Sequence, residues 1–128
     1  MAATPESKVK AKIHAMLKEH GVYAVNYIGG AFANNGTPDI LACVRGRFYA
    51  IEAKAGKNRP TDLQLSNLRR ISEAGGVALV INETNLIYLE DLLYGRIPIR
   101  SNYQLFERAQ EGPGPDAEPK VRRRAEGA

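Results

Sequence analysis

Residues 39–54 read DILACVRGRFYAIEAK, and this stretch decides the fold. Two apolar runs, DILACV and FYAIEAK, are separated by only three residues, RGR. Three residues are too few for a helical crossover, so the two runs are expected to pair as antiparallel strands of a hairpin. Charged residues stand at the open end of this hairpin, because Asp39 begins the first run while Glu52 and Lys54 end the second.

The turn of the hairpin determines which of these charged residues face one another. A two-residue turn at Gly46-Arg47, with glycine first, is one of the two favoured hairpin turns. It places Asp39 directly opposite Lys54 and diagonal to Glu52, with all three side chains on one face of the sheet. A register shifted by one residue would instead send Asp39 to the other face.

The chain before the hairpin predicts a helix, a strand and a loop. Thr4 can cap the helix, Pro5 suits its first position, and Glu6 lies at the positive end of its dipole. One apolar stripe follows at helical spacing, and Gly21 ends the helix; the stripe comprises Val9, Ile13, Met16, Leu17 and His20. Residues 22–28 (VYAVNYI) favour a strand, and the next ten, GGAFANNGTP, favour a loop.

The chain after the hairpin predicts a second helix and a last strand. Thr61 and Gln64 have capping-box spacing at the start of a helix that ends at Gly75-Gly76. Residues 77–81 (VALVI) are wholly apolar, which is typical of a strand buried on both faces. Residues 86–95 combine a remnant of a strand with a short helix, and residues 103–111 suggest another helix. This order predicts an α/β sandwich, with a central mixed sheet flanked by helices.

The sequence predicts one domain, residues 1–111, and a polar C-terminal tail, residues 112–128, with three prolines and almost no apolar content. We expect this tail to be disordered, and its Arg122-Arg123-Arg124 run forms either a basic arm or a dispensable segment. No stretch approaches 18 consecutive apolar residues, and no apolar signal core follows the first methionine. We therefore expect an intracellular, cytoplasmic protein with no membrane contact.

Composition excludes some kinds of site. The single cysteine, Cys43, rules out an internal disulfide framework, and its expected role inside an apolar strand is core packing. His14 and His20 are too few for a zinc site built on imidazoles. The net charge of +4 permits a nucleic-acid partner without requiring one.

The charged residues of the hairpin suit a site for a hard cation. Mg²⁺ prefers oxygen ligands and is usually held by one or two carboxylates together with substrate phosphates, which fits Asp39 and Glu52. A nearby ammonium such as that of Lys54 can hold an attacking water or stabilise charge on phosphorus. The competing interpretation is an ordinary surface ion pair between Lys54 and either carboxylate, worth about 0–1 kcal/mol.

The order and spacing of the motifs resemble a known superfamily. Gly36-Thr37-Pro38-Asp39, followed by Glu52-Ala53-Lys54 at the end of an apolar strand, resembles the PD-(D/E)XK nucleases. The longer pattern resembles the virus-type replication-repair nuclease (VRR-NUC) domain within that superfamily. This pattern adds Glu6 on the opening helix, the glycine-rich loop, the segment FYAIEAKAGKNRPTDLQ, and a final GG before an apolar strand. The resemblance covers about residues 5–90 and implies a restriction-endonuclease-like sandwich.

The resemblance also implies a role for each matched residue. Asp39 and Glu52 would bind Mg²⁺, for which Mn²⁺ would substitute, together with the main-chain carbonyl of Ala53. Lys54 would orient or activate the water that attacks the scissile phosphate. Gln64 would contact that water, the phosphate or Lys54, alongside its role in the capping box. Glu6 would be an accessory acid, and its alternative role is that of an acid placed favourably at a helix start.

The implied activity is endonucleolytic cleavage of DNA, with no organic cofactor. The resemblance implies a homodimer that cuts branched DNA such as four-way (Holliday) junctions. It also implies a phage or prophage role in replication, recombination or repair. The apolar stretch 86–94 is our hypothesis for part of a dimer interface, against its alternative as ordinary core. Lys57 and Arg59 follow the motif closely enough to contact a phosphate backbone, or else they are plain loop charges.

Two other functions remain open at this stage. The first is a catalytically idle DNA-binding module of the same fold, and the intact Asp39, Glu52 and Lys54 argue against it. The second is a sequence-specific restriction-type nuclease, which would need a recognition segment that the ordered chain has little room to supply.

Overall fold

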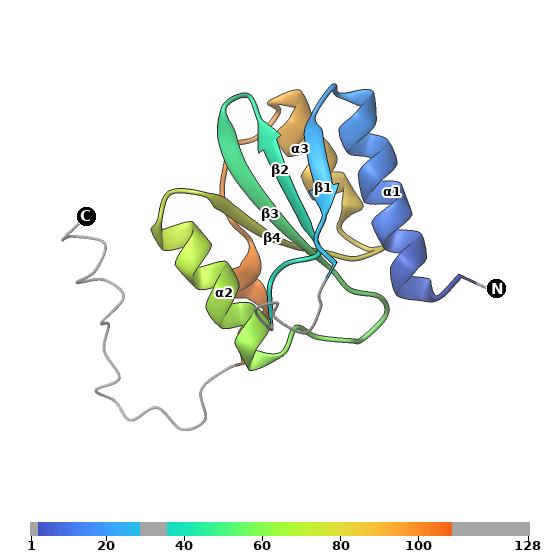
Figure 1. Ribbon diagram of the computed structural model, residues 1–128, viewed down its shortest axis with the longest axis vertical. Coiled ribbons are helices and arrows are strands. Elements are labelled where there is room, and N and C mark those ends of the chain that lie inside the picture. The colour runs from blue at the N-terminus through green and yellow to red at the C-terminus, as the bar shows by residue number, and fades with distance from the viewer. Residues whose placement is uncertain (1–2, 29–35, 109–128) are drawn as a thin grey trace.

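The predicted hairpin is present in the computed structural model, which describes residues 3–28 and 36–108. It lies in the middle of a four-stranded mixed sheet with helices on both faces (Figure 1). The element order is α1 (Pro5–Glu19), β1 (Tyr23–Asn26), β2 (Ile40–Val44), β3 (Arg47–Ala53), α2 (Asp62–Glu73), β4 (Val77–Ile81), α3 (Leu86–Tyr94) and the short 3₁₀ helix η1 (Tyr103–Phe106). Strands β1, β2 and β3 pair antiparallel, and β4 pairs parallel to β3. The α/β class and the mixed sheet flanked by helices are confirmed.

The turn of the hairpin differs from the prediction. Val44 pairs with Arg47, so Arg45 and Gly46 form the turn, both at positive φ (49° and 80°). A positive φ disfavours arginine, but the Arg45 guanidinium donates to the carbonyls of Leu92 and Leu93 at the C-terminal end of α3 (3.1 and 3.0 Å). These distant contacts offset the local strain. Because the register moved by two residues, Asp39 stays on the predicted face, and its partner across the hairpin becomes Glu52 rather than Lys54.

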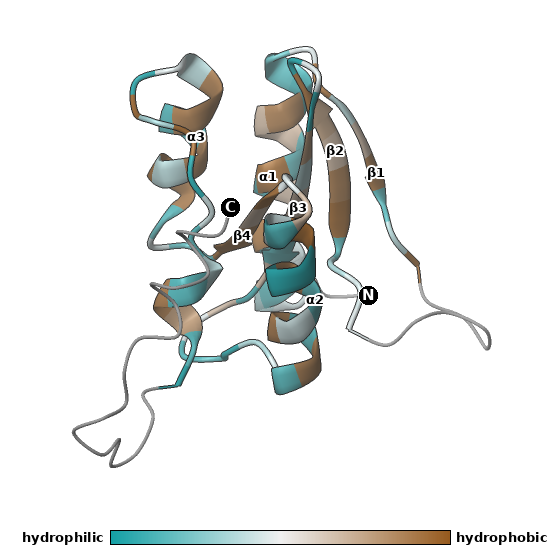
Figure 2. Ribbon diagram, turned by 90° about the vertical axis from the view of Figure 1, so that its left-hand side faces the viewer, coloured by the Kyte–Doolittle hydropathy of each residue, from teal (hydrophilic) through white to brown (hydrophobic). Residues whose placement is uncertain are grey.

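Helices cover the two faces of the sheet unequally. Helices α1 and α3 pack on one face, over the larger core cluster. Helix α2 and η1 pack on the other face, over β3 and β4 only; this smaller cluster consists of Leu65, Leu68, Ala78, Val80 and Tyr103. In Figure 2, viewed from the side of α2, no helix stands in front of β1 and β2. Glu52, which pairs with Val80 in β4, lies on the face covered by α2.

The open half of the sheet corrects the expectation for Cys43. Its side chain is exposed, because it lies between Tyr23 and Phe48 on the part of the sheet that α2 does not reach. Tyr23 is 75% exposed and Phe48 47% exposed. Alternation along β2 therefore places Cys43 on the apolar but uncovered side of the strand.

Several element boundaries also differ from the predictions. The strand expected over 22–28 is shorter, and residues 86–94 form a helix with no strand portion. Three apolar residues of α3 are buried in the core, which favours the core interpretation of this segment, while Ile87 and Tyr94 are exposed. Residues 103–111 contain only one 3₁₀ turn within the described part.

Most of the predicted loop over 29–38 and the tail over 112–128 lie outside the described residues. Within the described ranges, no helix has both the length and the apolar character needed to cross a bilayer.

Gly36, at the start of the GTPD motif, provides a test of how the motif loop contacts α2. Its φ is +81°, and an added Cβ would lie 2.8 Å from the Leu63 Cγ and 3.0 Å from the Leu63 backbone carbonyl carbon. Gly46 has a similar φ of +80° but no atom within 4 Å of its Cβ position. We expect Gly46→Ala to lower the free energy of unfolding by about 1–2 kcal/mol, and Gly36→Ala to lower it by about 1–3 kcal/mol more. Urea unfolding measures both, and equal losses would contradict the close contact at Gly36.

Candidate active site

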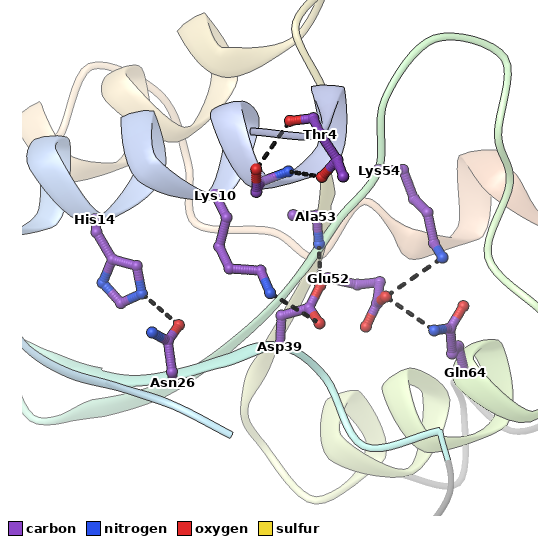
Figure 3. A network of polar contacts seen from close by, with 10 residues as sticks. Thr4, Lys10, His14, Asn26, Asp39, Glu52, Ala53, Lys54 and Gln64 are labelled. Carbon is purple, nitrogen blue, oxygen red and sulfur yellow. Dashed lines mark hydrogen bonds and ion pairs between the residues drawn. The ribbon is translucent and has the colours of Figure 1, made fainter. Parts of the chain in front are cut away.

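Asp39 and Glu52 meet where β2 begins and β3 ends. The outermost pair of the hairpin joins Ile40 to Ile51, so the next residues outward, Asp39 and Glu52, face one another. The Asp39 Oδ2 atom accepts a hydrogen bond from the Ala53 N–H at 2.9 Å. This bond fixes the orientation of the Asp39 carboxylate relative to the end of β3 (Figure 3).

Glu52 is a buried acid in an unusual environment. Its side chain is only 1% exposed, and Oε2 accepts a hydrogen bond from the Gln64 Nε2 at 2.9 Å. The other oxygen, Oε1, is buried and has no hydrogen-bond partner among the described residues. Loss of solvation, reinforced by the nearby charge of Asp39, raises the pKa of Glu52 to about 8. A buried oxygen left without a partner is the exception in folded proteins and often marks a functional position.

Lys54 lies on the same face as Glu52, two residues further along the chain. Its Nζ is 3.6 Å from the Glu52 Oε2, and its side chain is only 12% exposed. The Lys54 N–H donates to the Ile81 carbonyl, which continues the pairing of β3 with β4 and holds the backbone in place. The ammonium is directed at the Glu52 carboxylate rather than at bulk water (Figure 3).

Gln64 contributes to both the start of α2 and the acidic pair. Its Oε1 accepts from the Thr61 N–H at 2.8 Å, and Thr61 Oγ1 accepts from the Gln64 N–H at 3.1 Å, which completes the capping box. Its Nε2 remains available to donate to Glu52. The capping and the catalytic interpretations of Gln64 are therefore compatible, because the two functions use different atoms of one amide.

The two roles of Gln64 can be separated by mutation. Thr61→Ala removes the capping hydroxyl and is expected to lower the free energy of unfolding by about 1 kcal/mol while leaving the Glu52 contact in place. Gln64→Ala removes the Gln64 side chain from the capping box and also removes its hydrogen bond to Glu52. We therefore expect an additional loss of about tenfold or more in Mg²⁺ affinity, because Glu52 loses a supporting hydrogen bond. Thermal unfolding and Mg²⁺ titration measure the two effects. Equal Mg²⁺ affinities in the two variants would contradict this assignment.

The donor set fits a hard divalent cation. Within residues 3–28 and 36–108, no three His, Cys, Asp or Glu side chains are close enough together to hold a metal ion by themselves. Mg²⁺ does not need three, because it commonly binds one or two carboxylates and keeps several waters. Glu52 Oε1 has no hydrogen-bond partner in the described part of the chain, and Asp39 adds a nearby like charge, so a cation bound there would relieve both problems.

The remaining predicted residues, Glu6, Lys57 and Arg59, make no hydrogen bond or ion pair with Asp39 or Glu52 in the described chain. Glu6 and Lys57 line one cavity of about 640 Å³ between the first turn of α1 and the loop after β3, and Glu6 contributes to raising the pKa of Glu52. The guanidinium of Arg59 donates to the Phe106 carbonyl of η1, which gives it a structural role in the described chain.

One residue beside the site was missed by the sequence analysis. Lys10, on α1, has its Nζ 3.8 Å from the Asp39 Oδ1. Its only signal in the sequence is its spacing of four residues from Glu6, which places both on one side of α1. That signal is weak because three other lysines lie on the same helix, at positions 8, 12 and 18.

Comparison with known proteins finds similarity to a solved structure but no match to a family model or to a curated protein. The sequence matches no known family model. No curated protein matches it either. Among solved structures, it is similar to Hjc, a Holliday junction resolvase from the archaeal hyperthermophile Archaeoglobus fulgidus, with 21% sequence identity and a TM-score of 0.48. The match covers 59% of this chain and 66% of the archaeal chain, just under two-thirds of its length.

Proposed function

We propose that this chain is a metal-dependent endonuclease that hydrolyses phosphodiester bonds in DNA. The observation that carries the proposal is the environment of Glu52: a buried carboxylate near a second carboxylate and a lysine, with one oxygen that has no partner among the residues the structure describes. Buried carboxylate oxygens that serve only the fold usually have a hydrogen-bond partner. The same residues form the motif by which the sequence resembles the PD-(D/E)XK nucleases and, more narrowly, the VRR-NUC domain.

Each residue has a role that its position supports. Asp39, Glu52 and the Ala53 carbonyl would hold Mg²⁺ or Mn²⁺, which lowers the pKa of a bound water and polarises a phosphate oxygen. Lys54 lies 3.6 Å from Glu52 and is placed to hold the attacking water or to stabilise charge on the phosphate. Gln64 keeps Glu52 in position through its 2.9 Å hydrogen bond. Glu6 would act as an accessory acid at the edge of the cavity that it shares with Lys57.

The proposed substrate is branched DNA such as a four-way junction, and the proposed assembly is a homodimer. Both rest on the sequence resemblance to stand-alone VRR-NUC nucleases. Symmetric cleavage of a four-way junction needs two active sites, which a two-fold dimer supplies. Lys57 and Arg59 are exposed and remain candidates for contacts with the phosphate backbone.

An idle DNA-binding module is the main alternative function. Two carboxylates that face a polyanion weaken binding unless a cation neutralises them, so a module that only binds DNA would gain from losing them. Asp39 and Glu52 are both present and close enough for the charge of Asp39 to raise the pKa of Glu52, which favours catalysis.

Cleavage of a synthetic four-way junction and of a linear duplex of the same sequence tests the proposal. The protein is assayed with Mg²⁺, with Mn²⁺ or with EDTA, beside Glu52→Gln. Paired cuts in the junction that need a metal ion and are lost in the variant would support the nuclease and its substrate. Cuts in the duplex alone would favour a sequence-specific nuclease. Binding of the junction without any cleavage would favour the idle module.

A further inference from the structure

A polar stripe on α1 extends the candidate site beyond the motif. Glu6, Lys10 and His14 recur every four residues and therefore lie on one side of the helix. His14 Nε2 and Asn26 Oδ1, on β1, are 2.6 Å apart, and Lys10 lies one turn closer to the hairpin end, beside Asp39. Figure 3 shows both side chains reaching from α1 toward the strands. Lys10, the middle residue of the stripe, is therefore the one that contacts the acidic pair.

Both oxygens of Asp39 have a partner. Oδ2 accepts the Ala53 N–H at 2.9 Å, and Oδ1 lies 3.8 Å from the Lys10 ammonium. Each carboxylate of the pair therefore has its own lysine, since Lys54 lies 3.6 Å from Glu52. The two lysines differ in burial: the side chain of Lys54 is 12% exposed and that of Lys10 is 33% exposed. Lys10 is thus the more exposed of the two lysines.

We propose that Lys10 is the resident counter-cation of Asp39, which an entering divalent cation must displace. This inference rests on the proposed metal site and adds a positioning residue to it. Without metal, the ammonium pairs with the charge of Asp39 and keeps the Asp39 carboxylate in place. A divalent cation that binds Asp39 meets the same ammonium as a like charge, so Lys10 moves toward solvent. Lys10 therefore stabilises the metal-free protein and weakens metal binding.

Lys10 is expected to raise the stability of the metal-free protein and to lower its affinity for metal. A residue with a merely structural role would not have these opposite effects. Replacing Lys10 by a neutral residue removes a favourable ion pair from the metal-free protein and a repulsion from the metal-bound protein. A residue that only supported the fold would weaken stability and metal affinity together. Lys10→Met suits the test because methionine keeps the length of the side chain and the helix propensity of lysine.

The test is calorimetric titration of the DNA-free protein with CaCl₂ and with MgCl₂, beside thermal unfolding of the metal-free protein in EDTA. For Lys10→Met we expect metal binding to tighten by about three- to tenfold and Tm without metal to fall by about 2–6 °C. Lys10→Arg keeps the charge and should behave like the wild type. Lys8→Met is the matched control, because Lys8 is exposed on the opposite side of the same helix.

The outcomes separate this inference from the proposed function. Metal binding that is unchanged or weaker in Lys10→Met, or an unchanged Tm without metal, would overturn the role of Lys10 and leave the metal site standing. The same shifts in Lys8→Met would also overturn it, because they would reflect the charge of the whole helix. A wild-type protein that binds neither Ca²⁺ nor Mg²⁺ would overturn both the metal site and the role of Lys10.

Discussion

Glu52→Gln is expected to lower the rate of metal-dependent DNA cleavage by roughly a thousandfold. The substitution preserves the shape of the side chain and an oxygen that can accept the Gln64 hydrogen bond, but it removes the negative charge. Two carboxylates face one another at the end of the hairpin, and the loss of one leaves the cation a single anionic ligand. The measurement is single-turnover cleavage of a four-way junction at saturating Mg²⁺.

Two controls make the result interpretable. Glu19→Gln removes an exposed acid near the end of α1 and should leave the cleavage rate within twofold of the wild type. Binding of the junction in Ca²⁺-free buffer with EDTA should be retained by Glu52→Gln, since the variant reduces negative charge near the DNA. Full cleavage by Glu52→Gln would contradict the assignment of this carboxylate to the reaction.

The face of the sheet that carries the acids could be predicted from residues 39–54, whereas the turn could not. A short hairpin with alternating side chains places Asp39 and Glu52 on one face for either of two registers that differ by two residues. The register itself depends on Arg45, whose positive φ is offset by carbonyls of Leu92 and Leu93, almost fifty residues further along the chain. No local pattern contains that contact.

Other differences have the same origin in contacts between distant segments. Apolar alternation predicted that Cys43 lies in a strand, but its exposure depends on how far α2 extends across the sheet. The four-residue spacing from Glu6 to Lys10 identifies one side of α1, whereas the contact with Asp39 depends on how α1 crosses the end of β2. Gln64 was easier to predict because its capping partner, Thr61, is only three residues away.

The metal-free protein should lose stability as the pH rises from about 4.5 toward 8. The pKa of Glu52 is about 8 in the folded protein against an ordinary value of 4.5, mainly because burial disfavours the charged form. Between these values the folded state holds a proton that the unfolded state has released, so the free energy of unfolding falls as the pH increases and levels off above pH 8. The total loss is on the order of 3–5 kcal/mol, a large share of the stability of a small domain.

Glu52→Gln tests this pH dependence directly, because its neutral amide has no proton to lose. In EDTA the variant should be as stable as the wild type near pH 5 and more stable near pH 9, while Glu19→Gln should follow the wild-type curve at both. Mg²⁺ should reverse the wild-type trend, since it binds the ionised carboxylate and its stabilising effect grows as the pH approaches 8. Urea unfolding at pH 5, 7 and 9, with and without Mg²⁺, measures all of these differences. Parallel stability curves for the wild type and Glu52→Gln in EDTA would show that Glu52 is ionised in the folded protein even without a metal. That result would remove the main physical reason for placing a cation at Glu52 Oε1.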